Sequence, residues 1–217
     1  WLSFNAATGV LSGTPTNSNV GNHSVTLRAT DSNNVSTDQS FTIAVSNVND
    51  APTITSSAVT SVNEDSGYSY EFTASDVDSG DNVTLSAQTK PSWLSFDPGT
   101  GVLAGTPTNV NVGSHSIVLK ATDTSGAMDS QSFTITVNNV NDAPVITSSA
   151  ITSVNEDSGY SYTFAASDVD SGDSLTLSAQ TKPSWLDFNT ATGVLSGTPT
   201  NSDVGSHSVV LKATDGS

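Results

Sequence analysis

The chain has 217 residues, with 21 acidic against 5 basic side chains and a net charge of −16. This charge excludes nucleic acid as an expected partner, because an acidic chain repels phosphate backbones, and it disfavours an anionic membrane surface for the same reason. The absence of cysteine excludes disulfides and thiolate zinc sites. No apolar run approaches the roughly 18 residues of a membrane-spanning helix, so we expect no membrane insertion of this segment.

The sequence repeats itself with a constant period. A Trp-Leu-x-Phe segment begins at Trp1, Trp93 and Trp185, which are 92 residues apart. That period is too long for a solenoid unit and is typical of one autonomous domain per repeat. The period predicts three parts: the C-terminal part of a first repeat (1–49), a complete repeat (50–141), and a third repeat without its last strand (142–217).

Within a repeat, apolar and polar residues alternate with a period of two. In the middle repeat this pattern covers residues 68–75, 115–122 and 133–138, and it predicts strands with one face on a core. Turn sequences separate the runs, and no amphipathic helix is expected. About seven short strands in about 90 residues predict an all-β fold of tandem Ig-like sandwiches. The turns lie at 78–81, 97–101, 106–109 and 124–126.

Two aromatic positions recur in every repeat. Trp93 follows Pro91, and we expect it to fill the core of the sandwich; an exposed platform for stacking on sugar rings is the alternative. His23, His115 and His207 start an alternating strand in phase with its core face, and no second metal-binding or catalytic group recurs beside them. We interpret these histidines as structural.

The acidic residues are concentrated in a few recurring segments, and only three of them are glutamates. Calcium takes 6–8 oxygen ligands, and aspartate is one of its preferred ligands. Loops gather at the two ends of an Ig-like sandwich, so acidic segments from neighbouring repeats can meet at a linker. The alternative is that these aspartates only cap turns. The segments are 76–81 and 168–173, 63–65 and 155–157, 47–50 and 139–142, and the single Asp31, Asp123 and Asp215.

These motifs resemble those of cadherin repeats, especially dystroglycan-type cadherin-like repeats and related putative Ig domains of large bacterial surface or secreted proteins. The linker Asn-Val-Asn-Asp-Ala-Pro at 47–52 and 139–144 is similar to the cadherin linker Asp-x-Asn-Asp-Asn-x-Pro. Asp76-Val77-Asp78 resembles the cadherin Asp-x-Asp motif, and Ala121-Thr122-Asp123 resembles Ala-x-Asp. Glu64 lies where cadherins carry a glutamate at the base of the domain. The resemblance covers the whole chain and implies cadherin-like Greek-key sandwiches.

The resemblance also implies calcium (Ca²⁺) ligands at the junctions between repeats. One junction would take Glu64 with the linker residues Asn139, Asn141 and Asp142 and with Asp168, Asp170 and Asp215. An earlier junction would take Asn47, Asn49 and Asp50 with Asp76, Asp78 and Asp123, and its glutamate would lie before Trp1.

The chain departs from the cadherin pattern at two motifs, and in the linker the first position is Asn rather than Asp and the last is Ala51 or Ala143. Cadherins carry Leu-Asp-Arg-Glu, which supplies two further carboxylates, where residues 105–109 here read Gly-Thr-Pro-Thr-Asn. Fewer charged ligands predict one or two ions per junction, with affinities of roughly 10⁻⁴–10⁻³ M.

These patterns predict a calcium-binding adhesion or spacer segment, extracellular or at the cell surface, in which calcium stiffens a rod of repeats. We expect no enzyme activity, since catalytic sites are rarely copied into every unit of an array. The alternatives are a carbohydrate-binding module of a secreted polysaccharide-degrading enzyme and a passive stalk. Other copies of the repeat or cell-surface glycans are the expected partners besides calcium. We also expect the third repeat to be the least stable part or to pair its open edge with another molecule.

Overall fold

The computed structural model describes residues 1–216 and contains strands β1 to β20 with three short 3₁₀ helices. The prediction of an all-β fold is confirmed. The helices lie at Asn17–Asn19, Asn109–Asn111 and Asn201–Asp203, in the Thr-Pro-Thr-Asn segments that the sequence predicts as turns. Among the described residues, no helix is both long enough and apolar enough to cross a membrane.

The described residues form two compact units. The first unit comprises residues 1–62, 67–106 and 114–136, and the second comprises residues 63–66, 107–113 and 137–216. The second unit thus includes two short segments of the middle repeat, which lie with the linker and the third repeat. Each linker between repeats therefore falls inside one unit. The repeat boundaries at 49/50 and 141/142 stay a prediction.

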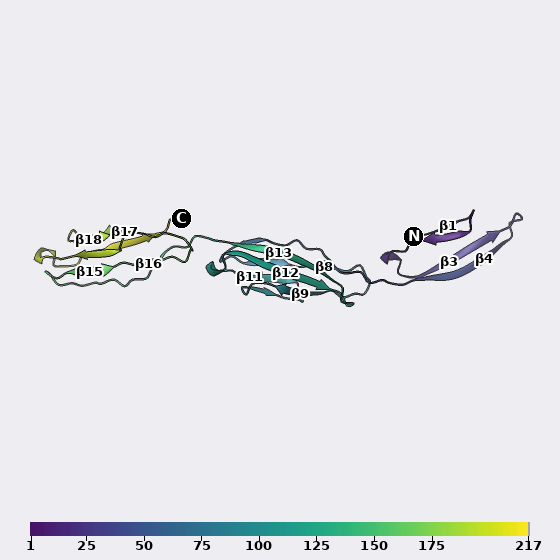
Figure 1. The fold of residues 1–217 in the computed structure, drawn as a ribbon, viewed down its shortest axis with the longest axis horizontal. Coiled ribbons are helices and arrows are strands. Elements are labelled where there is room, and N and C mark those ends of the chain that lie inside the picture. The colour runs from purple at the N-terminus through teal and green to yellow at the C-terminus, as the bar shows by residue number, and fades with distance from the viewer. Residues whose placement is uncertain (217) are drawn as a thin grey trace. The chain divides into compact units, whose positions relative to one another are not determined.

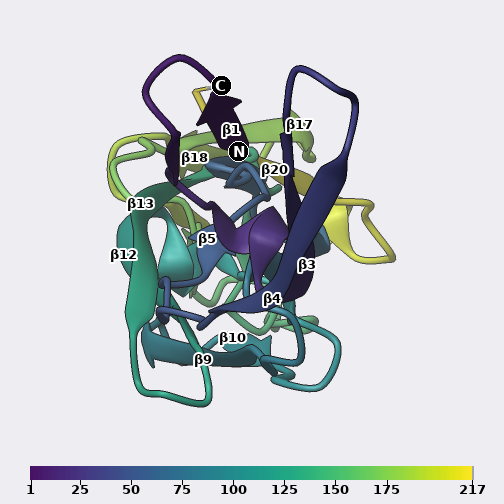
Figure 2. The ribbon, with the colours of Figure 1, turned by 90° about the vertical axis from the view of Figure 1, so that its right-hand side faces the viewer.

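The first repeat consists of two separate hairpins. Strand β1 (Leu2–Asn5) pairs with β2 (Val10–Gly13), and β3 (Gly21–Thr30) pairs along its whole length with β4 (Ser36–Val45). The β3–β4 hairpin is visible in Figures 1 and 2. No residue from 1 to 49 is buried.

The middle repeat is a sandwich of two main sheets. One sheet has the order β10-β11-β7 and the other has the order β6-β13-β12-β9, while β5 pairs with β8. Figure 1 shows β12 and β13 side by side in the ribbon of this repeat, as the strand order gives them. The strand bounds are β5 (Thr53–Ile54), β6 (Ser61–Asn63), β7 (Tyr68–Glu71), β8 (Ala74–Ser75), β9 (Thr84–Thr89), β10 (Leu94–Phe96), β11 (Val102–Gly105), β12 (Gly113–Thr122) and β13 (Met128–Asn138).

The core of the middle repeat lies between these two sheets. It is built from the inward positions that the alternating pattern predicts, and Phe72, Leu103 and Leu119 are completely buried. Trp93 packs against this cluster and meets Tyr68 and His115 edge to face, at ring-centroid distances of 6.1 and 5.8 Å. The structural interpretation of this tryptophan is thereby supported.

One glycine is required by the packing of neighbouring strands. A Cβ atom added to Gly105 would lie 2.1 Å from the backbone oxygen of Trp93, and the equivalent Gly197 would place one 2.0 Å from the oxygen of Trp185. Any side chain at these positions would push apart the hairpin that carries the tryptophan.

The third repeat keeps the same strand order over a smaller core. The sheets are β15-β19-β18, β17-β20 and β14-β16. Tyr162, Phe164, Leu186 and Leu195 are its buried apolar residues. The strand bounds are β14 (Val145–Ile146), β15 (Tyr160–Thr163), β16 (Ala166–Ser167), β17 (Thr176–Thr181), β18 (Leu186–Asn189), β19 (Val194–Gly197) and β20 (Val210–Thr214).

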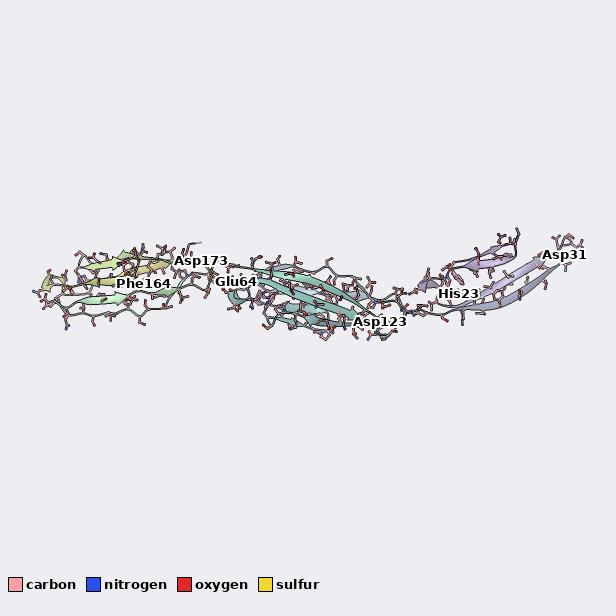
Figure 3. All side chains as sticks on the ribbon, in the orientation of Figure 1. His23, Asp31, Glu64, Asp123, Phe164 and Asp173 are labelled. Carbon is pink, nitrogen blue, oxygen red and sulfur yellow. The ribbon has the colours of Figure 1, made fainter. Side chains whose placement is uncertain are left out.

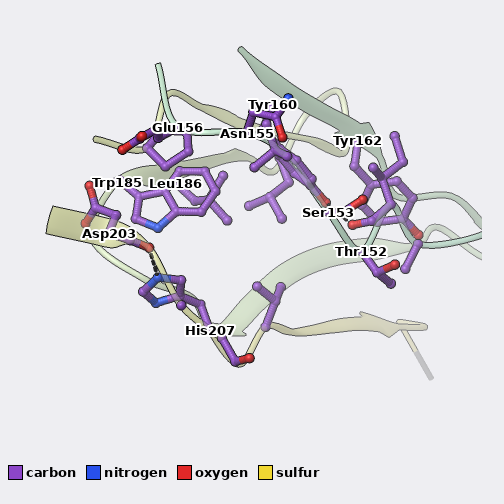
Figure 4. Close-up of a pocket in the computed structure, with 18 of the residues that line it drawn as sticks. Thr152, Ser153, Asn155, Glu156, Tyr160, Tyr162, Trp185, Leu186, Asp203 and His207 are labelled. Atoms are coloured by element: carbon purple, nitrogen blue, oxygen red, sulfur yellow. Dashed lines mark hydrogen bonds between the residues drawn. The ribbon is translucent and has the colours of Figure 1, made fainter. Parts of the chain in front are cut away.

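An open cavity of about 980 Å³ lies beside this smaller core. Figure 4 shows Tyr160, Tyr162 and Trp185 lining it, together with His207, whose ring is hydrogen-bonded to the backbone oxygen of Asp203. Much of the apolar surface that the sequence pattern prepares for a core is therefore accessible in this repeat.

Candidate metal centres

Two clusters of three carboxylates each could hold a metal ion. In the first cluster, one oxygen from each of Asp76, Asp81 and Asp123 lies within 4.8 Å of the others. In the second cluster, Asp168, Asp170 and Asp173 meet the same criterion. Asp123 follows the last residue of β12 (Figure 3), and the other aspartates lie in the loops after β8 and β16. We call these groups the first and the second acidic cluster.

The linker before the middle repeat is hydrogen-bonded to the first acidic cluster. The Asn49 side-chain amide donates to Oδ2 of Asp123 at 2.9 Å. The backbone N–H of Asp50 donates to Oδ2 of Asp78 at 2.7 Å. These bonds bring together the linker and loop residues that the sequence predicts for the earlier junction, with the exception of Asn47, which is exposed and makes no hydrogen bond that joins the cluster.

The linker before the third repeat makes matching contacts. The backbone N–H of Asp142 donates to Oδ2 of Asp170 at 2.7 Å. The Asn141 amide approaches Oδ2 of Asp215 at 3.3 Å. The two junctions share this pattern because both linkers have the same sequence and precede the same Asp-Val-Asp loop.

Glu64 reaches the second linker from the middle repeat. Its side chain is only 1% exposed, and its Oε1 accepts a hydrogen bond from the backbone N–H of Val140 at 2.8 Å. Val140 lies between Asn139 and Asn141, so the glutamate is held beside the residues that the sequence assigns to the same junction. Glu64 is not a member of either three-carboxylate cluster in residues 1–216.

Four buried carboxylate oxygens at these places have no hydrogen-bond donor within the described part of the chain. A buried, unpaired carboxylate oxygen is costly, and the cost falls when a cation or a donor meets it. The two ion pairs found in residues 1–216, Arg28–Asp38 and Lys182–Asp187, involve neither cluster. The donor set therefore fits a hard divalent cation. The four atoms are Oε2 of Glu64, Oδ2 of Asp76, Oδ2 of Asp81 and Oδ2 of Asp168.

Turn capping uses only one of the two carboxylate oxygens of Asp76 and of Asp123. Oδ1 of Asp76 accepts the backbone N–H of Asp78 at 2.8 Å, and Oδ1 of Asp123 accepts that of Ala127 at 2.8 Å. Oδ2 of Asp76 has no donor, and Oδ2 of Asp123 faces the linker instead. Each aspartate thus caps its own loop with one oxygen and presents the other toward the junction.

Hydrogen bonds across the junctions favour the ionised form of two aspartates. The Asn49 side chain lowers the pKa of Asp123, with further help from backbone N–H groups of its loop. The backbone N–H of Asp142 lowers the pKa of Asp170, and the side-chain amides of Asn109 and Asn139 add to the effect. Both carboxylates therefore stay charged, and able to bind a cation, somewhat below the pH at which an ordinary aspartate is protonated.

Sequence reasoning missed two kinds of residue at the junctions. Asp81 and Asp173 belong to the clusters, and their signal was the third acid of the repeated Asp-Val-Asp-Ser-Gly-Asp segment. Asn17 and Asn109 also reach the junctions, donating to Oδ1 of Asp78 and of Asp170. Their signal is the recurrence of Thr-Pro-Thr-Asn, a segment whose sequence by itself predicts a turn.

The sequence profile of the "Putative Ig domain" family matches residues 1–46, 51–138 and 143–217. The chain belongs to this family. The resemblance to cadherin-like and Ig-like repeats is thereby confirmed, and the family match covers nearly the whole chain in three copies.

A curated relative is the "Serine-rich adhesin for platelets" of Staphylococcus aureus (strain MRSA252), 35% identical over 144 residues. The alignment covers 65% of this chain and 10% of that protein, and 6% of the same adhesin from strain MSSA476. The chain thus spans a tenth or less of the length of these relatives. The predicted extracellular or cell-surface location agrees with them.

Solved cadherin structures share the fold. Extracellular domains 1–5 of protocadherin gamma B2 align with 100% of this chain and 47% of their own, at a TM-score of 0.58 and 20% identity. Mouse cadherin-23 domains 22–24 align with 100% of this chain and 77% of theirs, at a TM-score of 0.57 and 20% identity. At this identity the likeness establishes the sandwich fold alone. An endo-fucoidan hydrolase also matches, but its TM-score of 0.39 is too low to carry an argument.

Proposed function

We propose that this chain is a calcium-binding segment of an extracellular adhesion or spacer array, and that it is not an enzyme. The observation that carries the proposal is the pair of acidic clusters, each next to a linker and each containing buried carboxylate oxygens without a donor. Calcium would supply the positive charge that these oxygens lack. The family match and the adhesin relatives support a role in a surface array.

The proposed ligands come from each linker and from the repeat that follows it, and at the second junction Glu64 is added from the repeat before it. At the first junction they are Asn49, Asp50, Asp76, Asp78, Asp81 and Asp123, and at the second they are Glu64, Asn139, Asn141, Asp142, Asp168, Asp170, Asp173 and Asp215. A cation held by carboxylates of a linker and of the following repeat would turn mutual repulsion into attraction. The linker would then bend less freely, which is what a spacer or an adhesive stalk requires.

The first experiment is small-angle scattering of the whole chain in millimolar calcium and in chelator, with calorimetric titration of the ion. We expect binding in the roughly 10⁻⁴–10⁻³ M range and a stiffer, more extended particle with calcium. Identical scattering profiles and no heat of binding would contradict the proposal.

A matched pair of variants separates metal binding from turn capping. Oδ1 of Asp76 and Oδ1 of Asp97 each cap a loop N–H at 2.8 Å, but only Asp76 belongs to an acidic cluster. Asp76→Asn is expected to weaken calcium binding at the first junction by tenfold or more, because a charged ligand is lost, whereas Asp97→Asn leaves it unchanged. Equal effects of the two variants would favour simple turn capping.

The carbohydrate-binding alternative has less support from the side chains that it would use. Tyr68 and Tyr70 are 3% and 4% exposed, so neither offers a flat face to a sugar ring. Trp93 is half-buried and is enclosed edge to face by Tyr68 and His115. Binding to a polysaccharide that is lost on Trp93→Ala, with folding retained, would revive this alternative.

A further inference from the structure

Two asparagines make the same long-range contact at the two junctions. Asn17 and Asn109 are each the first residue of a 3₁₀ helix that follows Thr-Pro-Thr. The Asn17 Nδ2 group donates to Oδ1 of Asp78 at 2.8 Å, and the Asn109 Nδ2 group donates to Oδ1 of Asp170 at 2.7 Å. Each bond joins residues 61 positions apart and so connects one repeat to the Asp-Val-Asp loop of the next.

We propose that Asn17 and Asn109 are clasps between successive repeats that need no metal, and that each positions the second aspartate of the Asp-Val-Asp loop of the next repeat. The amide is neutral, so it binds the carboxylate without adding to the negative charge at the junction. A carboxylate at the same place would repel the cluster, and a lysine would compete with a cation for it.

The clasp is held rigid from within its own repeat. The backbone N–H of Thr108 donates to Oδ1 of Asn111 at 3.0 Å, and the backbone N–H of Thr16 donates to Oδ1 of Asn19 at 3.0 Å. These bonds stabilise the 3₁₀ helix whether or not the side chain of its first residue contacts the next repeat. The amide of Asn109 is therefore presented in a fixed direction, which reduces the entropy lost when it binds.

The contact leaves the aspartate able to bind a cation. Oδ1 of Asp170 accepts Asn109 and Oδ2 accepts the backbone N–H of Asp142, and the side-chain amide of Asn139 is a third donor to this carboxylate. The two oxygens together have about four lone-pair sites, so a site remains for a cation. The clasp and a cation can therefore be bound together, and the clasp would lower the ordering cost of the cation; this last step rests on the proposed calcium function.

The third repeat supplies a matched control. Its Thr-Pro-Thr-Asn segment forms the same 3₁₀ helix, closed by Asp203 on the backbone N–H of Thr200 at 2.9 Å. Asn201 is exposed, and its side chain makes no hydrogen bond within residues 1–216. Asn201→Ala removes the same atoms from the same local structure without removing a contact between repeats.

The test uses the whole chain in chelator, so that no metal contributes. Backbone ¹⁵N relaxation should report greater independent motion of the third repeat in Asn109→Ala, and exchange of the Asp142 amide should be faster by about tenfold or more, as expected for one hydrogen bond to a charged group. Asn201→Ala should match the wild type, as should the first junction of Asn109→Ala. An unchanged Asn109→Ala, or an equal effect of Asn201→Ala, would overturn the clasp.

Reversing the hydrogen bond gives a second readout that a purely local role would not produce. Asn109→Asp should loosen the junction as much as Asn109→Ala does, because it faces Asp170 with a like charge. The double variant Asn109→Asp/Asp170→Asn restores an amide–carboxylate pair in the opposite direction and should recover the slow exchange. Failure of this rescue, with both single variants folded, would contradict the clasp.

Calcium titration of the same variants keeps this inference distinct from the proposed function. If calcium binds, Asn109→Ala should weaken binding at the second junction by about fivefold and leave the first junction unchanged. If calcium does not bind any variant, the proposed function fails, while the measurements in chelator still decide whether the clasp exists.

Discussion

The middle and third repeats have nearly the same sequence at a spacing of 92 residues, yet their strands differ in length and pairing. In the middle repeat, β12 runs over ten residues and lies between β13 and β9. In the third repeat, β20 covers five residues and pairs only with β17. Residues 205–209, which correspond to the start of β12, are not in a strand. The full length of β12 thus coincides with its pairing to β13.

Strand β13 also completes the core. It supplies Ile135, which is completely buried, and Phe133, which packs against the cluster, while Gln131 accepts a hydrogen bond from the Tyr70 hydroxyl at 2.7 Å. In the third repeat, Tyr162 shares a hydrogen bond with Ser148, and the open cavity lies beside it. Tyr162, the equivalent of Tyr70, thus lines the cavity in the third repeat, whereas Tyr70 is hydrogen-bonded to β13 in the middle repeat.

Glu64 and its equivalent Glu156 also differ between the middle and the third repeat. Glu64 is buried and accepts the N–H of Val140, two residues after β13. Glu156 occupies the same position in the third repeat and is exposed. The same glutamate of the motif is therefore buried beside a linker N–H in the middle repeat and exposed in the third.

The largest difference is expected from matched leucines in the two cores. Leu103 and Leu195 are equivalent and are 0% and 1% exposed. Leu103→Ala should lower the free energy of unfolding of the middle repeat by about 2–5 kcal/mol, because a closed core cannot relax around the lost volume. Leu195→Ala should cost less, since the wall beside it is already open. Denaturant unfolding followed residue by residue by NMR measures both, and equal losses would contradict the comparison.

Hydrogen exchange tests the predicted weakness of the third repeat directly. Amides of β20 are expected to exchange at least about tenfold faster than those of β12, because β20 has a pairing partner on one side only. The measurement needs a monomeric sample, verified by light scattering. If β20 were protected as well as β12 in the monomer, the prediction would be wrong.

A peptide with the sequence of residues 130–138 should reduce the difference in amide exchange rate between the middle and third repeats. It offers the alternating Phe, Ile and Val side chains that cover the core of the middle repeat, and we expect it to slow exchange in β20 of the whole chain. A control peptide with aspartate in place of the phenylalanine and the isoleucine should have no effect. Equal effects of the two peptides would show that the cavity does not select a strand.

The smallest expected effect concerns the stability of the protein at alkaline pH. It depends on one tyrosine in each core, Tyr68 in the middle repeat and Tyr160 in the third. Burial raises the pKa of Tyr68 to about 12, with a smaller contribution from Tyr70, and burial also raises the pKa of the equivalent Tyr160. A raised folded-state pKa adds stability below the unfolded value of about 10, and this stability is lost as the pH rises toward 12. Absorbance titration should find that Tyr68 ionises late, and that Tyr68→Phe removes this late step.

Much of the fold followed from patterns that act locally. The 92-residue period, the alternation in 68–75 and 115–122, and the repeated turns predicted the sandwich class and the inward residues. The interruption between β7 and β8 and the 3₁₀ helix at Asn109 were not predicted, because a bend in a strand and a turn that tightens into a helix depend on packing partners distant in sequence.

The candidate site likewise has features that the sequence determined and features that only the tertiary structure decided. The sequence by itself determined which carboxylates recur and that linkers lie next to them, since each repeat carries the same short acidic motifs. Only the tertiary structure decided that Asp81 and Asp173 join the clusters, that Asn47 stays outside, and that an asparagine from a turn reaches the aspartate of the next repeat. The physical reason is that the contacts of Asn17 and Glu64 join residues 61 and 76 positions apart, so their geometry is set by how whole strands pack. Asp168 and Asp173 are close in sequence, but the loop conformation that brings their carboxylates together is not determined by their spacing.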